Sequence, residues 1–158
     1  MTDPITSSAR FVLKESLGEL RAAVEGVPAE ALNWRPAGEE TNSVAVLATH
    51  ALHSTRSWLS VAVGGVELPE RDRSAEFRAM EDDPGALLRL VDEMSEECRA
   101  SLRDAGEVDW SATRKISALA WDSSVQEVPA AFAILHALEH LGQHVAHASL
   151  TRQLWEAR

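Results

Sequence analysis

The sequence predicts an all-α fold, a four-helix bundle with long crossover connections, formed as a single domain by residues 1–158. Its length of 158 residues is a common size for one domain with its own hydrophobic core. Ala, Leu, Glu and Arg are abundant whereas β-branched residues are few, which favours helix over strand. Apolar residues also recur at helical spacing in four long stretches, with Gly, Pro and polar residues between them.

The first two helices have recognisable start and stop signals. We expect the first over residues 4–25, with Asp3 as its N-cap and a glycine after its end. The second is expected over residues 43–63, where polar side chains precede the apolar run and two glycines follow it. Residues 27–36 form a connector with room for one short helical turn. The apolar stripe of the first helix comprises Leu13, Leu17, Leu20 and Val24.

The third and fourth helices are expected over residues 84–105 and 129–155, each beginning at a proline. Two long connectors, residues 66–83 and 107–128, allow the chain to cross over the bundle. Connectors of this length in a compact domain often carry function. The apolar stripe of the third helix comprises Leu87, Val91, Met94, Cys98, Leu102 and Ala105.

Charge and composition exclude several classes of protein. With 15 Lys and Arg against 25 Asp and Glu, the net charge is −10, which disfavours binding to nucleic acid. No apolar run is long enough to span a membrane, and the N-terminus lacks the pattern of a signal peptide. The single cysteine, Cys98, cannot form an internal disulfide, in agreement with a cytoplasmic location.

The six histidines lie in two of the predicted helices and in none of the connectors. His50 and His53 are in the second helix, and the other four are in the fourth. At about 100° per residue, His50 lies on the same face as Val46 and Val61, whereas His53 lies on a wetter edge. We therefore expect His50 to point inward.

The four histidines of the fourth helix share one arc of about 80°. His140 and His144 lie nearest to the apolar arc that must face the core. The other two histidines of this arc are His136 and His147, and the apolar arc comprises Ile134, Leu138, Leu141 and Val145.

This pattern predicts a divalent-metal site built from His50, His140 and His144. Histidines at i and i+4 have Cβ atoms roughly 5–6 Å apart and can share one ion. A third imidazole from a facing helix gives three protein ligands, which leaves an open coordination position, as in catalytic sites. Imidazole suits Zn, Ni, Cu or Fe rather than Mg or Ca. The alternative, in which these histidines are ordinary surface or core residues, stays open at this point.

Three segments resemble those of DinB-like proteins, a family that includes thiol-dependent S-transferases and mycothiol-dependent maleylpyruvate isomerases. Residues 139–147 (EHLGQHVAH) resemble its last-helix signature, and residues 42–50 (NSVAVLATH) resemble its second-helix signature. Residues 33–36 (NWRP) resemble the segment that precedes the latter. The resemblance covers nearly the whole chain in order and length.

The resemblance implies a DinB/YfiT-like four-helix bundle, often homodimeric. It also implies a metal, commonly zinc or nickel, held by one histidine of the second helix and two of the last. By motif match these are His50, His140 and His144. Family members of known activity transfer or isomerise groups with a low-molecular-weight thiol, and many have no assigned reaction.

Other residues could contribute to a pocket. Trp58, Gln143 and His147 are candidates for the pocket or for contacts with the metal ligands, although core or surface roles are the plain alternatives. Glu139 is a candidate acceptor for the N–H of a ligating histidine, although an exposed helical glutamate is the simpler interpretation. Cys98 lies on an apolar stripe, which favours a buried, inert thiol.

Three hypotheses about function follow. The first is a thiol-dependent transferase or isomerase that acts through an open metal site and binds a thiol and a small molecule. The second is a non-catalytic metal-binding or stress-response protein that acts by binding a protein or small molecule. The third is a metal-free helical interaction protein in which the histidines are incidental.

Overall fold

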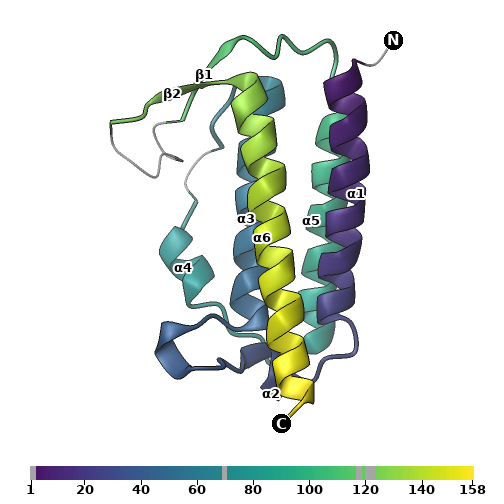
Figure 1. The fold of residues 1–158 in the computed structure, drawn as a ribbon, viewed down its shortest axis with the longest axis vertical. Helices are drawn as coiled ribbons and strands as arrows, with labels where there is room; N and C mark the ends of the chain where they lie inside the picture. The colour runs from purple at the N-terminus through teal and green to yellow at the C-terminus, as the bar shows by residue number, and fades with distance from the viewer. Residues whose placement is uncertain (1–2, 69–70, 117–118, 120–123) are drawn as a thin grey trace.

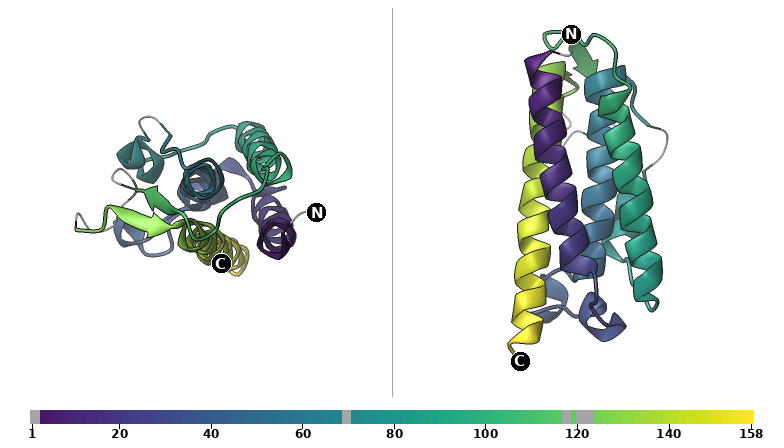
Figure 2. Two further views of the ribbon diagram at one scale, coloured as in Figure 1. Left: turned by 90° about the horizontal axis from the view of Figure 1, so that it is seen from above. Right: turned by 90° about the vertical axis from the view of Figure 1, so that its right-hand side faces the viewer.

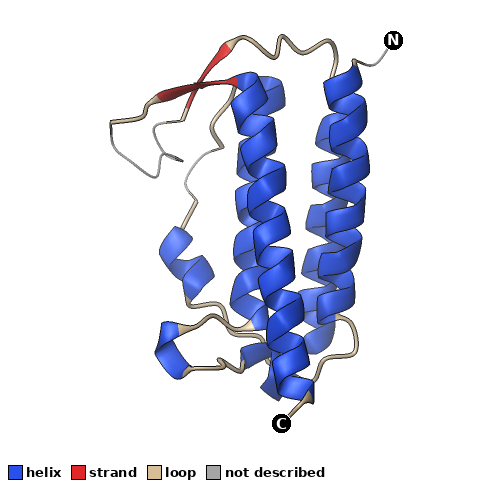
Figure 3. Cartoon of the chain, viewed as in Figure 1, coloured by secondary structure: helices blue, strands red, loops and turns tan. Residues whose placement is uncertain are grey.

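A computed structural model of the protein contains four long helices that stand side by side (Figure 1, Figure 3). They are α1 (Pro4–Val24), α3 (Val44–Leu59), α5 (Pro84–Arg103) and α6 (Ala130–Glu156). The structure describes residues 3–68, 71–116, 119 and 124–158. The predicted all-α fold class is confirmed, and the four long helices lie within two residues of their predicted limits, apart from the last turn of the second.

The helices are neighbours in a different order from that in the chain. Helix α1 packs mainly on α5 and α6, and α3 packs on the same two helices. The view along the bundle shows this arrangement (Figure 2). Helices α3 and α6 share the largest interface of the bundle although more than 70 residues separate them in sequence, as the predicted crossover connections require.

Side-chain caps start three of the long helices, as predicted. The carboxylate of Asp3, the hydroxyl of Ser43 and the carboxylate of Asp83 each accept a hydrogen bond from a first-turn N–H. Gly26 follows α1 with φ of 73°, a conformation that favours glycine. At the end of α3 the chain makes a π-helical turn, η2 (Ser60–Gly64), before it leaves the bundle.

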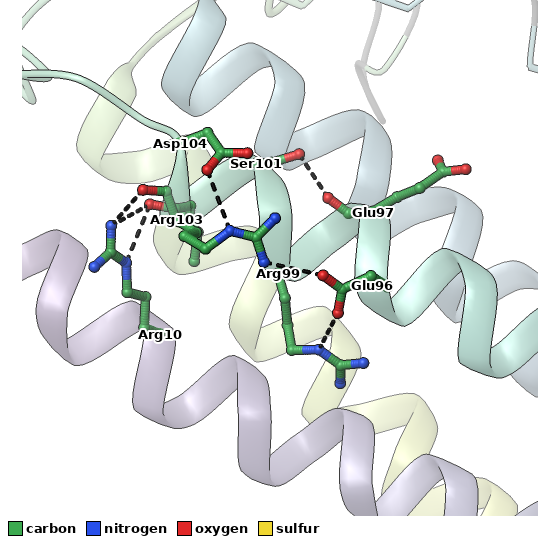
Figure 4. Close-up of polar contacts among 8 residues, drawn as sticks. Arg10, Glu96, Glu97, Arg99, Ser101, Arg103 and Asp104 are labelled. Atoms are coloured by element: carbon green, nitrogen blue, oxygen red, sulfur yellow. Dashed lines mark hydrogen bonds and ion pairs between the residues drawn. The ribbon is translucent and has the colours of Figure 1, made fainter.

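The C-terminus of α5 is tied to α1 by a single arginine. The guanidinium of Arg10 donates hydrogen bonds to the carbonyls of Leu102 and Arg103, at 2.6–3.1 Å (Figure 4). These carbonyls have no partner within the helix, so the cation both satisfies them and interacts favourably with the helix dipole. Glu96 accepts hydrogen bonds from Arg99 and Arg103 on the exposed side of the same helix (Figure 4).

The predicted apolar stripes form the core. All four stripe residues of α1 are buried, as are Leu87, Val91, Met94, Cys98 and Leu102 of α5. Ala105 is an exception, because α5 ends at Arg103 and the chain has turned away by that point. Trp34 and Trp155 pack edge to face at one end of the bundle, with ring centroids 5.7 Å apart.

The connectors contain more regular structure than predicted. The first holds α2 (Ala29–Asn33), which is the expected short turn, followed by a 3-10 turn, η1 (Gly38–Glu40). The second holds α4 (Arg73–Phe77), which lies beside α3 (Figure 1). The third holds two strands, β1 (Thr113–Lys115) and β2 (Glu127–Pro129), which pair antiparallel with Arg114 opposite Val128.

Helix α4 and the β1–β2 pair, which were not predicted, are short and depend on contacts with the bundle. Helix α4 has five residues, too few for a periodic pattern, and Asp72 caps it through the N–H of Ala75. The strands have three residues each, and the apolar side chains of Ile116 and Val128 are buried against the bundle. Among the described residues, no helix has the length and apolar character needed to cross a membrane.

Candidate metal centre

Three histidine side chains from two helices converge at one point. His50 extends from α3, and His140 and His144 extend from successive turns of α6. Their ring centroids are 4.4–5.2 Å apart, and one ligand nitrogen of each lies within 4.8 Å of the other two. In the described part of the chain, no other group of three His, Cys, Asp or Glu side chains meets in this way.

The closest pair of nitrogens has the spacing that a metal requires. Nε2 of His140 lies 3.2 Å from Nε2 of His144. Two imidazoles bound to one tetrahedral zinc, with Zn–N bonds of about 2.0–2.1 Å, have nitrogens about 3.3 Å apart. The donor set, three nitrogens and no carboxylate, is also one that zinc and nickel accept. The residues present therefore fit such an ion.

His140 and His144 are neutral at physiological pH. Burial, together with the neighbouring imidazoles of His144 and His50, lowers the pKa of His140 to about 3. Burial and the charge of His50 lower the pKa of His144 to about 4. Neutral imidazole is the form that binds a metal, so neither side chain must lose a proton near pH 7.

A buried carboxylate orients His50. Glu76 of α4 is 5% exposed, and its Oε2 lies 2.9 Å from Nδ1 of His50. Arg71 holds this carboxylate from the other side, with Nε 2.5 Å from Oε1 and Nη2 2.6 Å from Oε2. Burial alone would raise the pKa of Glu76, but the hydrogen bonds from His50 and Arg71 outweigh it and lower that pKa to about 2.

The ionised carboxylate selects the tautomer of His50. Nη2 of Arg71 also lies 3.1 Å from Nδ1, but an arginine can only donate and an ionised glutamate can only accept. Nδ1 therefore either donates its proton to Glu76 or accepts one from Arg71. The shorter contact and the negative charge favour donation to Glu76, which leaves the lone pair of Nε2 free for a metal.

Glu139, the candidate acceptor considered from sequence, does not hold a ligating histidine, and the simpler interpretation, an exposed helical glutamate, is the correct one. Glu139 is exposed, forms a hydrogen bond with Gln143, and approaches His136 no closer than 4.0 Å. No motif in the sequence pointed to Glu76 or to Phe77, whose ring centroid lies 4.5 Å from that of His50. The one available signal was the length and mixed charge of the connector in which both residues lie.

A cavity of about 190 Å³ adjoins His50 and His140. The indole of Trp58 is buried in the core and also lines this cavity, and its ring centroid lies 4.5 Å from that of His136. Gln143 and His147 are exposed and do not line this cavity. The remaining lining residues are Ser54, Arg71, Arg73, Leu119 and His136.

The other candidate groups lie away from this centre. His147 is exposed, with its ring 6.0 Å from that of His144, and it borders a separate groove beside Leu150 and Leu154. His53 is half-buried at the edge of α3, less exposed than its predicted position on the wetter edge. Cys98 is buried, and burial raises the pKa of its thiol to about 12, so the thiol stays protonated and unreactive.

Comparison with known proteins agrees with this architecture. The sequence model of the DinB superfamily matches residues 13–148, which include all four long helices in whole or in part and all three converging histidines. No curated protein matches the chain. On the evidence of the family match, the chain belongs to the DinB superfamily.

Proposed function

We propose that this DinB-superfamily protein binds one divalent metal ion, zinc or nickel, through His50, His140 and His144. The observation that carries the proposal is the convergence of three ligand nitrogens within 4.8 Å, two of them on residues with pKa values far below 7. The hydrogen bond from His50 to Glu76 adds support, because ligating histidines in proteins usually donate their second N–H to such an acceptor.

The same geometry supports a reaction that uses a thiol from solution. Three protein ligands leave a coordination position free, and the cavity provides space beside His50 and His140. All three ligands are uncharged, and a metal held in this way would bind a thiol as its thiolate. Cys98 cannot supply that sulfur because it is buried on the apolar stripe of α5. We therefore propose a metal-dependent transferase or isomerase whose co-substrate is a low-molecular-weight thiol.

Metal analysis tests the first part of the proposal. Protein purified without chelators is expected to hold about one equivalent of zinc or nickel by mass spectrometry. His140→Ala is expected to lose most of it, whereas the matched change His53→Ala, on the wetter edge of α3, should keep it. Equal metal content in wild-type protein and His140→Ala would remove the site.

A screen of metal-loaded protein tests the second part. Mycothiol, bacillithiol, glutathione and coenzyme A are each incubated with a panel of electrophiles, and loss of free thiol is measured. The proposal predicts thiol consumption that His140→Ala abolishes. If every thiol stays inert while the metal is present, the transferase proposal fails and a non-catalytic metal-binding protein remains.

A further inference from the structure

The cavity beside the three histidines carries an exposed cation, Arg73. Arg73, the first residue of α4, lines the cavity and is exposed. Its guanidinium carbon lies 5.7 Å from the ring centroid of Phe77, and that ring packs on His50. Among the residues that the structure describes, no carboxylate lies at ion-pair distance from Arg73.

The second arginine of the cavity cannot take the same role. Two nitrogens of Arg71 are engaged by Glu76, so the charges of this pair cancel. Among the lining residues that the structure describes, Arg73 is therefore the arginine without a carboxylate partner. An anion entering the cavity would meet a guanidinium whose donors are available.

The cavity is small, and one part of its wall is apolar. Trp58 and Leu119 line it, together with the ring of His136. Its volume of about 190 Å³ corresponds to roughly six water molecules at about 30 Å³ each. That space suits a compact group with a flat or short apolar body, and it excludes a bulky one such as a nucleotide.

We propose that this cavity binds a small organic carboxylate, with the carboxylate on Arg73 and the apolar body against Trp58. This inference rests on the proposed metal centre for its functional meaning, since it assigns the substrate class that would be held beside the open coordination position. A planar guanidinium forms paired hydrogen bonds with a carboxylate, which gives Arg73 the role of a specificity-determining residue.

Benzoate and crotonate serve as probes, and benzamide is the neutral match for benzoate. Binding is measured by calorimetry and by saturation-transfer NMR, on zinc-loaded and on chelator-treated protein. Zinc-loaded wild-type protein is expected to bind benzoate about tenfold more tightly than benzamide. Arg73→Gln is expected to lower benzoate affinity about tenfold, with benzamide binding and metal content unchanged. Arg78→Gln, which alters an exposed arginine at the end of the same helix, should have no effect.

Two outcomes separate this inference from the proposed metal centre. If carboxylates bind Arg73→Gln as tightly as wild-type protein, or do not bind wild-type protein at millimolar concentration, the Arg73 site is refuted while the metal result stands. If wild-type protein holds no metal, the metal centre is refuted, and Arg73-dependent benzoate binding to that protein would still support the anion site.

Discussion

Replacing Glu76 with Gln tests how the metal centre is held in place. The change removes the negative charge that accepts the proton of His50 Nδ1 and that neutralises Arg71. The new amide can donate to Nδ1, which would place the ring proton on Nε2 and block the nitrogen that faces the other two histidines.

The contacts of Glu76 set the size of the expected losses in metal affinity and in stability. Loss of the hydrogen-bond partner of a ligating histidine typically lowers metal affinity 10- to 100-fold, or about 1.4–2.7 kcal/mol. The paired side chains of Glu76 and Arg71 are 5% and 16% exposed, so their interaction is weakly screened. We also expect a loss of about 1–3 kcal/mol in the free energy of unfolding of the metal-free protein, since the amide keeps part of the hydrogen bonding.

Affinity is measured by competition with a chromophoric zinc chelator, and stability is measured by urea denaturation. Glu139→Gln is the matched control, because it makes the same chemical change on an exposed side chain of α6. A native circular dichroism spectrum of Glu76→Gln shows that the fold is kept. A zinc affinity within about twofold of wild type in such a folded variant would refute the role assigned to Glu76.

Two further predictions concern pH and chelation. Because the pKa values of His140 and His144 in the folded protein are about 3 and about 4, below the 6.5 of an unperturbed histidine, the unfolded metal-free chain takes up protons that the folded one does not. The free energy of unfolding, measured by urea denaturation, should therefore fall as pH decreases from about 6.5 towards 5. His140→Ala should show a shallower fall, and parallel pH profiles of the two proteins would contradict this. Removing the metal with a chelator should lower the melting temperature of wild-type protein by about 5–10 °C, the effect of losing a ligand present at about 100 times its dissociation constant. His140→Ala, measured in parallel, should show no such shift, and an unchanged wild-type melting temperature would count against a metal that links α3 to α6.

The long helices could be predicted because the sequence of each contains its own local signals. In α1 and α5 a capping aspartate, a proline at the first position and a regular apolar stripe fix the start and the buried face. The same periodicity distinguished His50 from His53, and it placed His140 and His144 beside the core arc of α6. The burial of His50 agrees with the inward orientation predicted for it.

The part of the site that could not be predicted from the sequence depends on tertiary contacts. Glu76 and Arg71 lie five residues apart in a charged connector, and no local pattern shows that this segment folds back onto α3. Helix α4 is too short to have a detectable periodicity, and Glu76 became informative only once its distance to His50 was known. The β1–β2 pair escaped prediction for a related reason, since each strand has three residues and is stabilised by contact with the bundle.

Anomalous diffraction from crystals of the purified protein, recorded at the zinc and nickel absorption edges, would locate the metal itself. We expect one peak at bonding distance, about 2.0–2.1 Å for zinc, from a nitrogen of each of His50, His140 and His144. A metal peak elsewhere in the molecule, or a metal-supplemented crystal with no peak between these three rings, would contradict this expectation.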